Sequence, residues 1–177
     1  IDMNKTICFF NTAIPWGGGE KWHFEMAKHL HESGHSVVIF CQKKSILFEK
    51  AKAQNIPNKI IGNSNTTFLN PLKLLYFSKL FQKHKIGTIV LNLSQDVKSG
   101  GIAAKLSGLK RIIYRRGSAI PVRNSSLNRF LYKNIIDEVL VNSKATQECI
   151  LQNNTALFPK DYIKVIPNGI DGLGFVK

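Results

Sequence analysis

Three consecutive glycines stand just before a helical pattern near the start of the chain. Gly17, Gly18 and Gly19 follow a short apolar run and precede Glu20, where the apolar periodicity of a helix begins. Glycine lets the backbone approach a ligand closely. The free N–H groups at the start of a helix, together with the helix dipole, attract phosphate, carboxylate or sugar oxygens. The turn therefore predicts a binding site, with a plain tight turn as the simpler interpretation.

Two adjacent arginines form a second candidate for chemistry. Arg115 and Arg116 precede Gly117 and Ser118, at the expected carboxyl end of a strand. Guanidinium groups recognise phosphates and carboxylates through paired hydrogen bonds. The stretch predicts an anion site, and the alternative is a role in surface solubility.

The glycine turn does not match the best-known nucleotide motifs. A dinucleotide site needs a third glycine where Trp22 stands, and an acidic residue where the second strand ends in Gln42, Lys43 and Lys44. No Gly-Lys-Ser/Thr follows the glycines, and no G-x-S-x-G occurs anywhere in the sequence. These mismatches argue against NAD binding, a P-loop and a serine hydrolase.

The histidines do not predict a metal site. His29, His31 and His35 are close in sequence, but their spacing cannot place all three on one helical face. His23 lies in the first turn after the glycines, so it reaches a bound ligand or is a solvated helix residue.

Buried strands and amphipathic helices alternate along the whole chain. This pattern predicts an α/β, three-layer Rossmann-like domain with a mostly parallel sheet of about seven strands. Ligands of such a sheet bind beyond the carboxyl ends of its strands, here the loops after residues 12, 41, 93, 114 and 141. The expected strands are 7–10, 36–41, 59–62, 88–93, 111–114, 138–141 and 163–166, and the expected helices follow the glycine turn and occupy 47–54, a segment from Pro71, 99–106, 125–136 and 143–152. The apolar stripe of the helix from Pro71 is expected to comprise Leu72, Leu75, Phe77, Leu80 and Phe81.

The charge balance favours anionic partners. The 177 residues contain 25 Lys and Arg against 11 Asp and Glu, a formal net charge of +14. No acidic residue lies between Asp96 and Asp137, which indicates an external anion or a membrane surface, with the basic flank of the helix at 125–136 as the contact. The charge alone also suggests a nucleic-acid-binding module, but no recognition motif or exposed aromatic strand accompanies it.

The sequence predicts a cytoplasmic protein. The chain has three cysteines, Cys8, Cys41 and Cys149, an odd number that cannot all form pairs within one chain. Two of them lie in apolar runs, which is typical of reduced cysteines in a protein core. No run approaches the ~18 apolar residues of a spanning helix, and no secretory signal pattern is present. Residues 1–2, ahead of Met3, are interpreted as a remnant of cloning.

Four pieces in a fixed order carry a family resemblance. They are the glycine turn with Glu20, the basic turn from Tyr114 to Gly117, the segment 141–143 that opens a helix, and the terminal IPNGID at 166–171. Together they resemble the N-terminal domain of a bacterial GT-B glycosyltransferase of the large retaining family 4, the group with lipopolysaccharide and capsule transferases. The resemblance covers residues 3–171, and the terminal IPNGID is its most specific mark.

The resemblance implies a sugar-transfer enzyme of two domains. The N-terminal domain mainly holds a glycan or lipid-linked acceptor, and a C-terminal domain absent from this chain binds most of the nucleotide-sugar donor. The family's Glu-x7-Glu pair and an Asp-x-Asp metal motif are both missing here. The expectation is therefore half of a metal-independent enzyme, with no cofactor, no nucleic-acid partner and a peripheral site on the inner membrane face.

The resemblance also assigns site residues. Many members place a histidine at the end of the fifth strand, where this chain has arginines. The residues expected in catalysis are Arg115, Arg116 and Glu20, with one arginine on an anionic acceptor or the donor phosphate. Those expected to bind donor or acceptor are Gly17, Gly18, Gly19, His23, Asn92, Ser94, Asn142, Ser143, Asn168 and Gly169.

Overall fold

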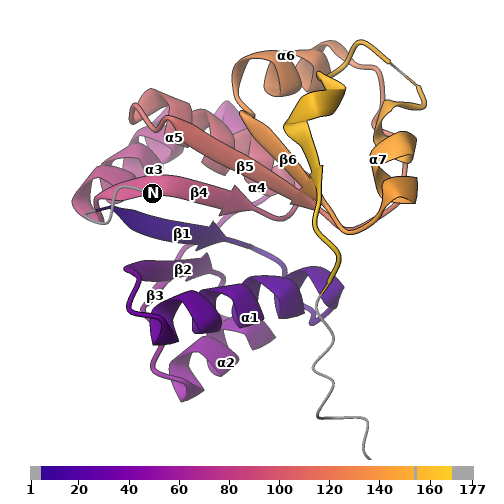
Figure 1. Ribbon diagram of the computed structural model, residues 1–177. Coiled ribbons are helices and arrows are strands. Elements are labelled where there is room, and N and C mark those ends of the chain that lie inside the picture. Colours follow the sequence, from indigo (N-terminus) through magenta and orange to yellow (C-terminus); the bar gives the residue numbers. More distant parts are fainter. Residues whose placement is uncertain (1–4, 154, 169–177) are drawn as a thin grey trace, which may run out of the picture.

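Seven parallel strands form the centre of the protein. The computed structural model describes residues 5–153 and 155–168 (Figure 1). Each strand pairs in parallel with its neighbours in the order β3-β2-β1-β4-β5-β6-β7, which confirms the expected parallel α/β sheet. The strands are β1 (Thr6–Phe10), β2 (Val37–Cys41), β3 (Asn58–Ile60), β4 (Ile86–Leu91), β5 (Arg111–Arg116), β6 (Glu138–Val141) and β7 (Ile163–Val165).

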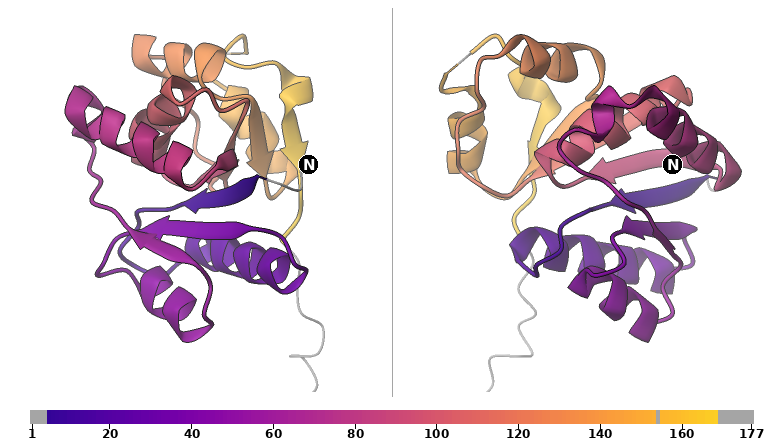
Figure 2. Two further views of the ribbon diagram at one scale, coloured as in Figure 1. Left: turned by 90° about the vertical axis from the view of Figure 1, so that its left-hand side faces the viewer. Right: turned by 180° about the vertical axis from the view of Figure 1, so that it is seen from behind.

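Helices cover both faces of this sheet and complete the three layers. The helical elements are α1 (Gly18–Glu32), α2 (Ile46–Ala53), η1 (Thr67–Leu69), α3 (Pro71–Lys83), α4 (Ser94–Asp96), η2 (Val97–Gly101), α5 (Ile102–Leu106), α6 (Ser126–Asn134), α7 (Lys144–Leu151) and η3 (Lys160–Tyr162). Helices α1 and α2 pack on one face, and α3, α5 and α6 pack on the other (Figures 1 and 2). Because strand side chains alternate between faces, Phe9 belongs to the first core and Phe10 to the second.

Strands are added first on one side of β1 and then on the other side. From β1 the chain adds β2 and then β3 on one side, and it then crosses to place β4 on the other side of β1. The carboxyl ends of β1 and β4 therefore flank a crevice where open sheets of this type bind ligands.

Several element boundaries differ from the sequence-based expectation. Strand β4 runs over Ile86–Leu91 instead of 88–93, and β5 extends to Arg116, so both arginines lie within the strand. The helical segment expected at 99–106 begins at Ser94 and passes through a π-helical turn, η2. A Cβ at Gly100 would lie 3.1 Å from Leu91 Cδ2, so this close packing favours glycine there.

The apolar stripe expected on α3 is wrong in two positions. Leu72 and Leu75 are exposed, and the buried face consists instead of Leu74, Phe77, Ser78, Leu80 and Phe81. A helix with apolar residues on both faces does not reveal from its sequence which face meets the sheet. The exposed leucines consequently need another explanation.

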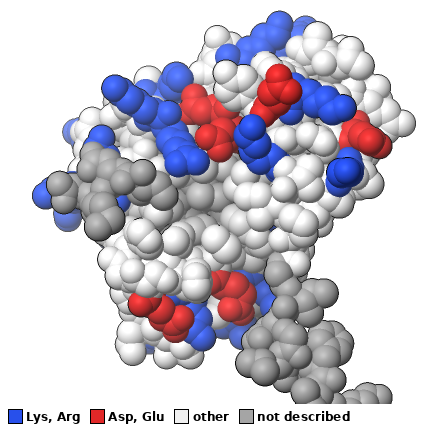
Figure 3. All heavy atoms as spheres, viewed as in Figure 1, with Lys and Arg blue, Asp and Glu red and all other residues white. Residues whose placement is uncertain are grey.

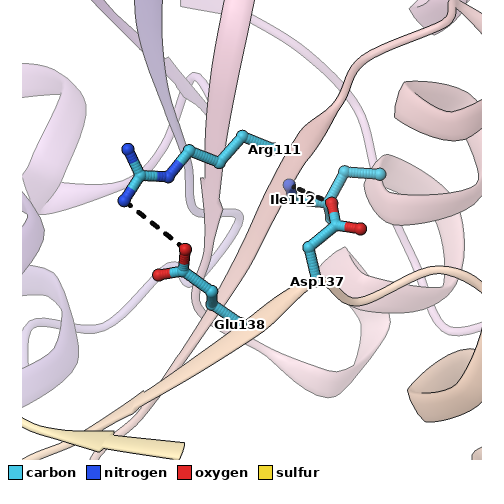
Figure 4. A network of polar contacts seen from close by, with 4 residues as sticks. All are labelled: Arg111, Ile112, Asp137 and Glu138. Atoms are coloured by element: carbon cyan, nitrogen blue, oxygen red, sulfur yellow. Dashed lines mark hydrogen bonds and ion pairs between the residues drawn. The ribbon is translucent and has the colours of Figure 1, made fainter. Parts of the chain in front are cut away.

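Two acidic residues at the start of β6 form side-chain contacts with β5. Asp137 Oδ2 accepts a hydrogen bond from the Ile112 backbone N–H at 2.8 Å, and Glu138 Oε1 lies 3.5 Å from Arg111 Nη2 (Figure 4). Figure 3 shows acidic and basic side chains intermingled on this face of the molecule. Within the described part of the chain, no helix has the length and apolarity to cross a membrane.

Candidate functional site

A polar pocket of about 340 Å³ opens at the carboxyl ends of the central strands. It combines the start of α1, which follows β1, with the segments that follow β4, β5, β6 and β7. Its lining residues are Gly18, Gly19, Glu20, Asn92, Leu93, Tyr114, Arg115, Arg116, Gly117, Ser118, Asn142 and Asn168. The pocket therefore lies at the crevice where the strand order reverses, and eight of the expected site residues meet there.

The three glycines of the turn have different structural roles. Gly17 is the extended N-cap of α1, and Gly18 and Gly19 begin the helix with their N–H groups unpaired within it. A Cβ at Gly19 would lie 2.6 Å from Asn92 Oδ1, whereas a Cβ at Gly18 would meet nothing within 4 Å. A Cβ at Gly17 would lie 3.0 Å from Glu20 Oε2, so packing restricts Gly19 most tightly, Gly17 less and Gly18 not at all.

Glu20 is a buried carboxylate at the pocket wall. Asn92 Nδ2 donates to Glu20 Oε1 at 2.7 Å, and Asn11 Nδ2 lies 3.5 Å from the same oxygen. These contacts join the loop after β4 to the first turn of α1. Glu20 also supplies the negative charge next to Arg115 that favours the charged guanidinium.

The two arginines leave opposite faces of β5. The Arg115 guanidinium lies over the Trp22 ring, 5.4 Å from its centroid, on the α1 side of the sheet. Arg116 Nη1 donates to Tyr114 Oη at 3.1 Å, on the side of α6, and Arg116 Nη2 donates to the Ile120 carbonyl. Because adjacent strand residues alternate in direction, the two guanidinium groups are not side by side. Arg115 therefore lines the pocket from the α1 side of the sheet, and Arg116 lines it from the α6 side.

Asparagines complete the rim next to Arg115. Arg115 Nη2 donates to Asn168 Oδ1 at 3.3 Å, and Asn142 Nδ2 donates to the Gly117 carbonyl at 3.2 Å. Burial lowers the pKa of Arg115, and the Glu20 charge opposes that shift. Arg115 therefore contacts the Trp22 ring and the Asn168 amide, and the charge of Glu20 favours its charged form.

The two serines among the expected binding residues do not line this pocket. Ser143 caps α7, where its hydroxyl accepts from the Thr146 N–H at 3.1 Å. Ser94 is exposed and lines a neighbouring pocket with Tyr114 and Arg116. Gly169 and the end of the IPNGID segment lie outside the described residues.

His23 is not a solvated helix residue, so that interpretation is wrong. Its ring is fully buried between Phe9 and Trp22, with both ring centroids 5.5 Å away. Burial, and secondarily the Arg115 charge, lowers the pKa of His23 to about 3. Neither ring nitrogen has a hydrogen-bond partner in the described structure. His23 is a neutral core residue beneath the pocket.

A buried polar cluster around the single carboxylate of Asp96 lies beside the pocket and was not predicted from the sequence. Asp96 is fully buried and accepts hydrogen bonds from the Thr12 hydroxyl, from Asn63 Nδ2 at 3.1 Å and from the Leu93 N–H at 3.0 Å. Burial raises the pKa of Asp96 to about 6, and these hydrogen bonds oppose the rise. The cluster joins the loops after β1, β3 and β4. In the sequence, the one indication of this cluster is that Asp96 is an isolated acid after β4, within a basic region.

No group of three or more potential metal ligands occurs among the described His, Cys, Asp and Glu residues. The site is instead built from amides, glycine N–H groups, one carboxylate and two guanidinium groups. Such groups bind anions and sugar hydroxyls through hydrogen bonds.

The fold and the pocket at its reversal point define a Rossmann-like domain that matches the N-terminal domains of GT-B glycosyltransferases. A sequence profile of Glycosyltransferase Family 4 matches residues 16–172, so the chain belongs to that family. Membership of glycosyltransferase family 4 and the expected Rossmann-like fold are thereby confirmed.

Solved structures share this fold at low sequence identity. A glycosyltransferase from Rickettsia africae ESF-5 superposes with a TM-score of 0.76 at 20% identity, over 94% of this chain and 44% of that one. HepE from Anabaena, solved with UDP-glucose, gives 0.74 at 20% identity, over 94% and 44%. The lipopolysaccharide outer core galactosyltransferase WaaB gives 0.66 at 19% identity, over 93% and 46%. The chain spans less than half the length of these structures, and no curated protein matches it significantly in sequence.

Proposed function

We propose that this chain is the acceptor-side N-terminal domain of a retaining glycosyltransferase of the lipopolysaccharide or capsule type. The enzyme moves a sugar from a nucleotide-sugar donor to a glycan or lipid-linked acceptor. The observation that carries the proposal is the pocket at the reversal point, which combines the start of α1 with Arg115, Arg116 and three asparagines. The solved complex of HepE with UDP-glucose and the similarity to the outer core galactosyltransferase WaaB support it.

The glycine turn and the arginines have separate roles in this proposal. The N–H groups of Gly18 and Gly19 stabilise the charge that develops on the donor diphosphate as its bond to the sugar breaks. Arg115, held near Glu20, binds an anionic group of the acceptor or the donor phosphate. Arg116 approaches from the other side of β5 and contacts the acceptor.

The reaction also needs a second domain. We propose that a C-terminal domain supplies most of the nucleotide site and the paired glutamates, and that no metal takes part. The enzyme is cytoplasmic and acts at the inner membrane face. The 177-residue chain alone is then expected to bind UDP-glucose weakly and to transfer no sugar. Sugar transfer by the purified chain would refute the division into two domains.

Binding of UDP-glucose by the chain tests the pocket directly. In ligand-observed NMR titrations, Arg115→Ala is expected to weaken binding about tenfold, since a charge-assisted hydrogen bond contributes roughly 1.5 kcal/mol or more. Arg129→Ala removes an exposed arginine of α6 outside this pocket and serves as the control. Equal losses in both variants would show that binding follows net charge instead of the pocket.

The net charge of +14 favours a second candidate, a basic nucleic-acid- or nucleotide-binding module without transferase activity. Such a module binds DNA or RNA with an affinity that falls steeply with salt. Tight, salt-dependent binding of an oligonucleotide, with no binding of UDP-glucose, would favour this candidate over the transferase.

A further inference from the structure

The outward face of α3 carries an apolar cluster that the described part of the protein does not cover. Leu69 of η1 is 69% exposed, and Leu72, Leu75 and Tyr76 of α3 are 76%, 51% and 45% exposed. The three α3 residues follow the three- and four-residue spacing of one helical face, which turns away from the buried Leu74 and Phe77. Helix α3 lies at the margin of its layer (Figure 2). We call Ile60, Leu69, Leu72, Leu75 and Tyr76 the α3 patch.

The α3 patch lies at the same edge of the sheet as the candidate site. A groove of about 370 Å³ joins Ile60, Ile61 and Gly62, at the carboxyl end of β3, to Leu72, Lys73 and Tyr76. The start of α3 is therefore at the edge where the strands end, whereas Lys83 precedes the beginning of β4. The apolar end of this helical face is therefore nearer to that edge than its lysine end is.

Positive charge continues the same face beyond the apolar residues. Lys79 and Lys83 follow Tyr76 by three and seven residues, and both are exposed. Burial lowers the pKa of His84 at the end of α3, and the charges of Lys59 and Lys83 lower it further. The face thus changes from leucine to lysine along one helix.

Acidic side chains are absent from the surface of this part of the molecule. From residue 50 to residue 136 the only acidic residue is Asp96, and Asp96 is fully buried. This range includes β3, η1, α3, α5 and α6. A surface with many cations and no exposed acids selects an anionic partner.

From these observations we infer that the α3 patch and its adjoining lysines bind an anionic lipid bilayer. Exposed leucines enter the interface between head groups and acyl chains, and flanking lysines attract the negative surface. Nucleic acid explains the lysines but not a face of leucines. The inference rests on the proposed action at a membrane, and it moves the membrane contact to α3 from the basic flank of α6, which the charge pattern of the sequence favoured.

Vesicle co-sedimentation with the 177-residue chain tests this inference. Binding to phosphatidylcholine vesicles with about 30% phosphatidylglycerol is expected to exceed binding to pure phosphatidylcholine and to weaken with salt. Leu72→Ser combined with Leu75→Ser should lower the partition coefficient about tenfold. Lys79→Glu combined with Lys83→Glu should cause a similar loss on anionic vesicles only.

Two single variants serve as matched controls. Ile46→Ser removes an aliphatic side chain that is 45% exposed on the opposite layer, and Phe130→Ser removes a ring that is 47% exposed on α6. Both should retain binding within about twofold, because neither lies in the α3 patch. All altered residues are exposed, and thermal unfolding of each variant verifies that it folds.

Several outcomes would overturn the inference. These are unchanged binding in the leucine variant, equal binding to neutral vesicles, a larger loss in Phe130→Ser, or a dimer in solution that disappears when the leucines are replaced. Oligonucleotide binding that survives replacement of the leucines, in the absence of vesicle binding, would assign the face to nucleic acid. UDP-glucose titrations of the same variants separate the two proposals, since the α3 patch does not line the sugar pocket.

Discussion

Adjacent glycines in the turn after β1 are constrained by different parts of the structure. The position of Gly19 leaves no room for a Cβ, because the Asn92 amide that donates to Glu20 occupies that space. The position of Gly18 is open. Packing therefore restricts the residue at position 19, whereas the described structure leaves room for a side chain at position 18.

Alanine at these two positions should give opposite results. Gly19→Ala displaces Asn92 and should lower the free energy of unfolding by about 1–2 kcal/mol, a typical cost of overpacking. Gly18→Ala should leave stability unchanged or slightly increase it, since alanine favours helix over glycine by roughly 0.5–1 kcal/mol. Urea unfolding of both variants measures this. Equal destabilisation would contradict the separate roles of the two positions.

At the level of elements, one buried carboxylate joins three loops at the edge of the sheet. Asp96 at the end of α4 binds Thr12 after β1, Asn63 after β3 and the backbone of Leu93 after β4. Gln95 Nε2 and the Thr12 hydroxyl, 2.9 Å apart, extend the cluster. These contacts hold the loops that flank the crevice in fixed positions.

This cluster predicts a pH dependence of stability. Burial raises the pKa of Asp96 from 3.8 to about 6 in the folded protein, so between these values the folded state retains a proton that the unfolded state loses. Stability relative to an Asp96→Asn variant should therefore fall as pH rises through this window, by roughly 2–3 kcal/mol in total. Urea unfolding of both proteins from pH 4 to pH 7 measures the difference. A difference that stays constant or grows with pH would contradict the raised pKa.

At the level of the whole molecule, charge is distributed unevenly between the layers. The α1 and α2 layer contains exposed acids, among them Glu25 and Glu32, and Glu32 pairs with Lys28. Residues 50–136 contain many Lys and Arg residues and one acid, the buried Asp96. Arg111, in this range, forms an ion pair with Glu138, which lies just beyond it. Repulsion within this region opposes folding.

Salt should therefore stabilise the free protein. Between about 0.02 and 0.2 M NaCl the screening length falls severalfold, and Tm should rise by roughly 2–4 °C, which corresponds to about 1 kcal/mol. The variant with Lys79→Glu and Lys83→Glu should respond less, because part of the repulsion is already removed. Differential scanning fluorimetry measures both proteins. A Tm that falls with salt would show that attractive pairs dominate.

The local pattern of the sequence determined most of the fold and the position of the site. Alternating apolar runs and helices are local properties, and they suffice to predict a parallel sheet with ligands at its carboxyl edge. The glycine turn and Arg115 were predicted from this pattern because one lies in the connection after a strand and the other at the end of a strand, whereas the family resemblance supplied Asn142 and Asn168. The resemblance carried by the short motifs added the family, which the profile match confirms.

Only the tertiary structure decided which face of each element meets the core and which loops meet one another. In the tertiary structure His23 is buried, and Arg115 and Arg116 point to opposite faces of the sheet. Leu72 and Leu75 are exposed. Thr12, Asn63 and Asp96, which are far apart in the sequence, are in contact. The physical reason is that these outcomes depend on strand order and on competition between two apolar helix faces. Both are settled by contacts between residues far apart in the sequence.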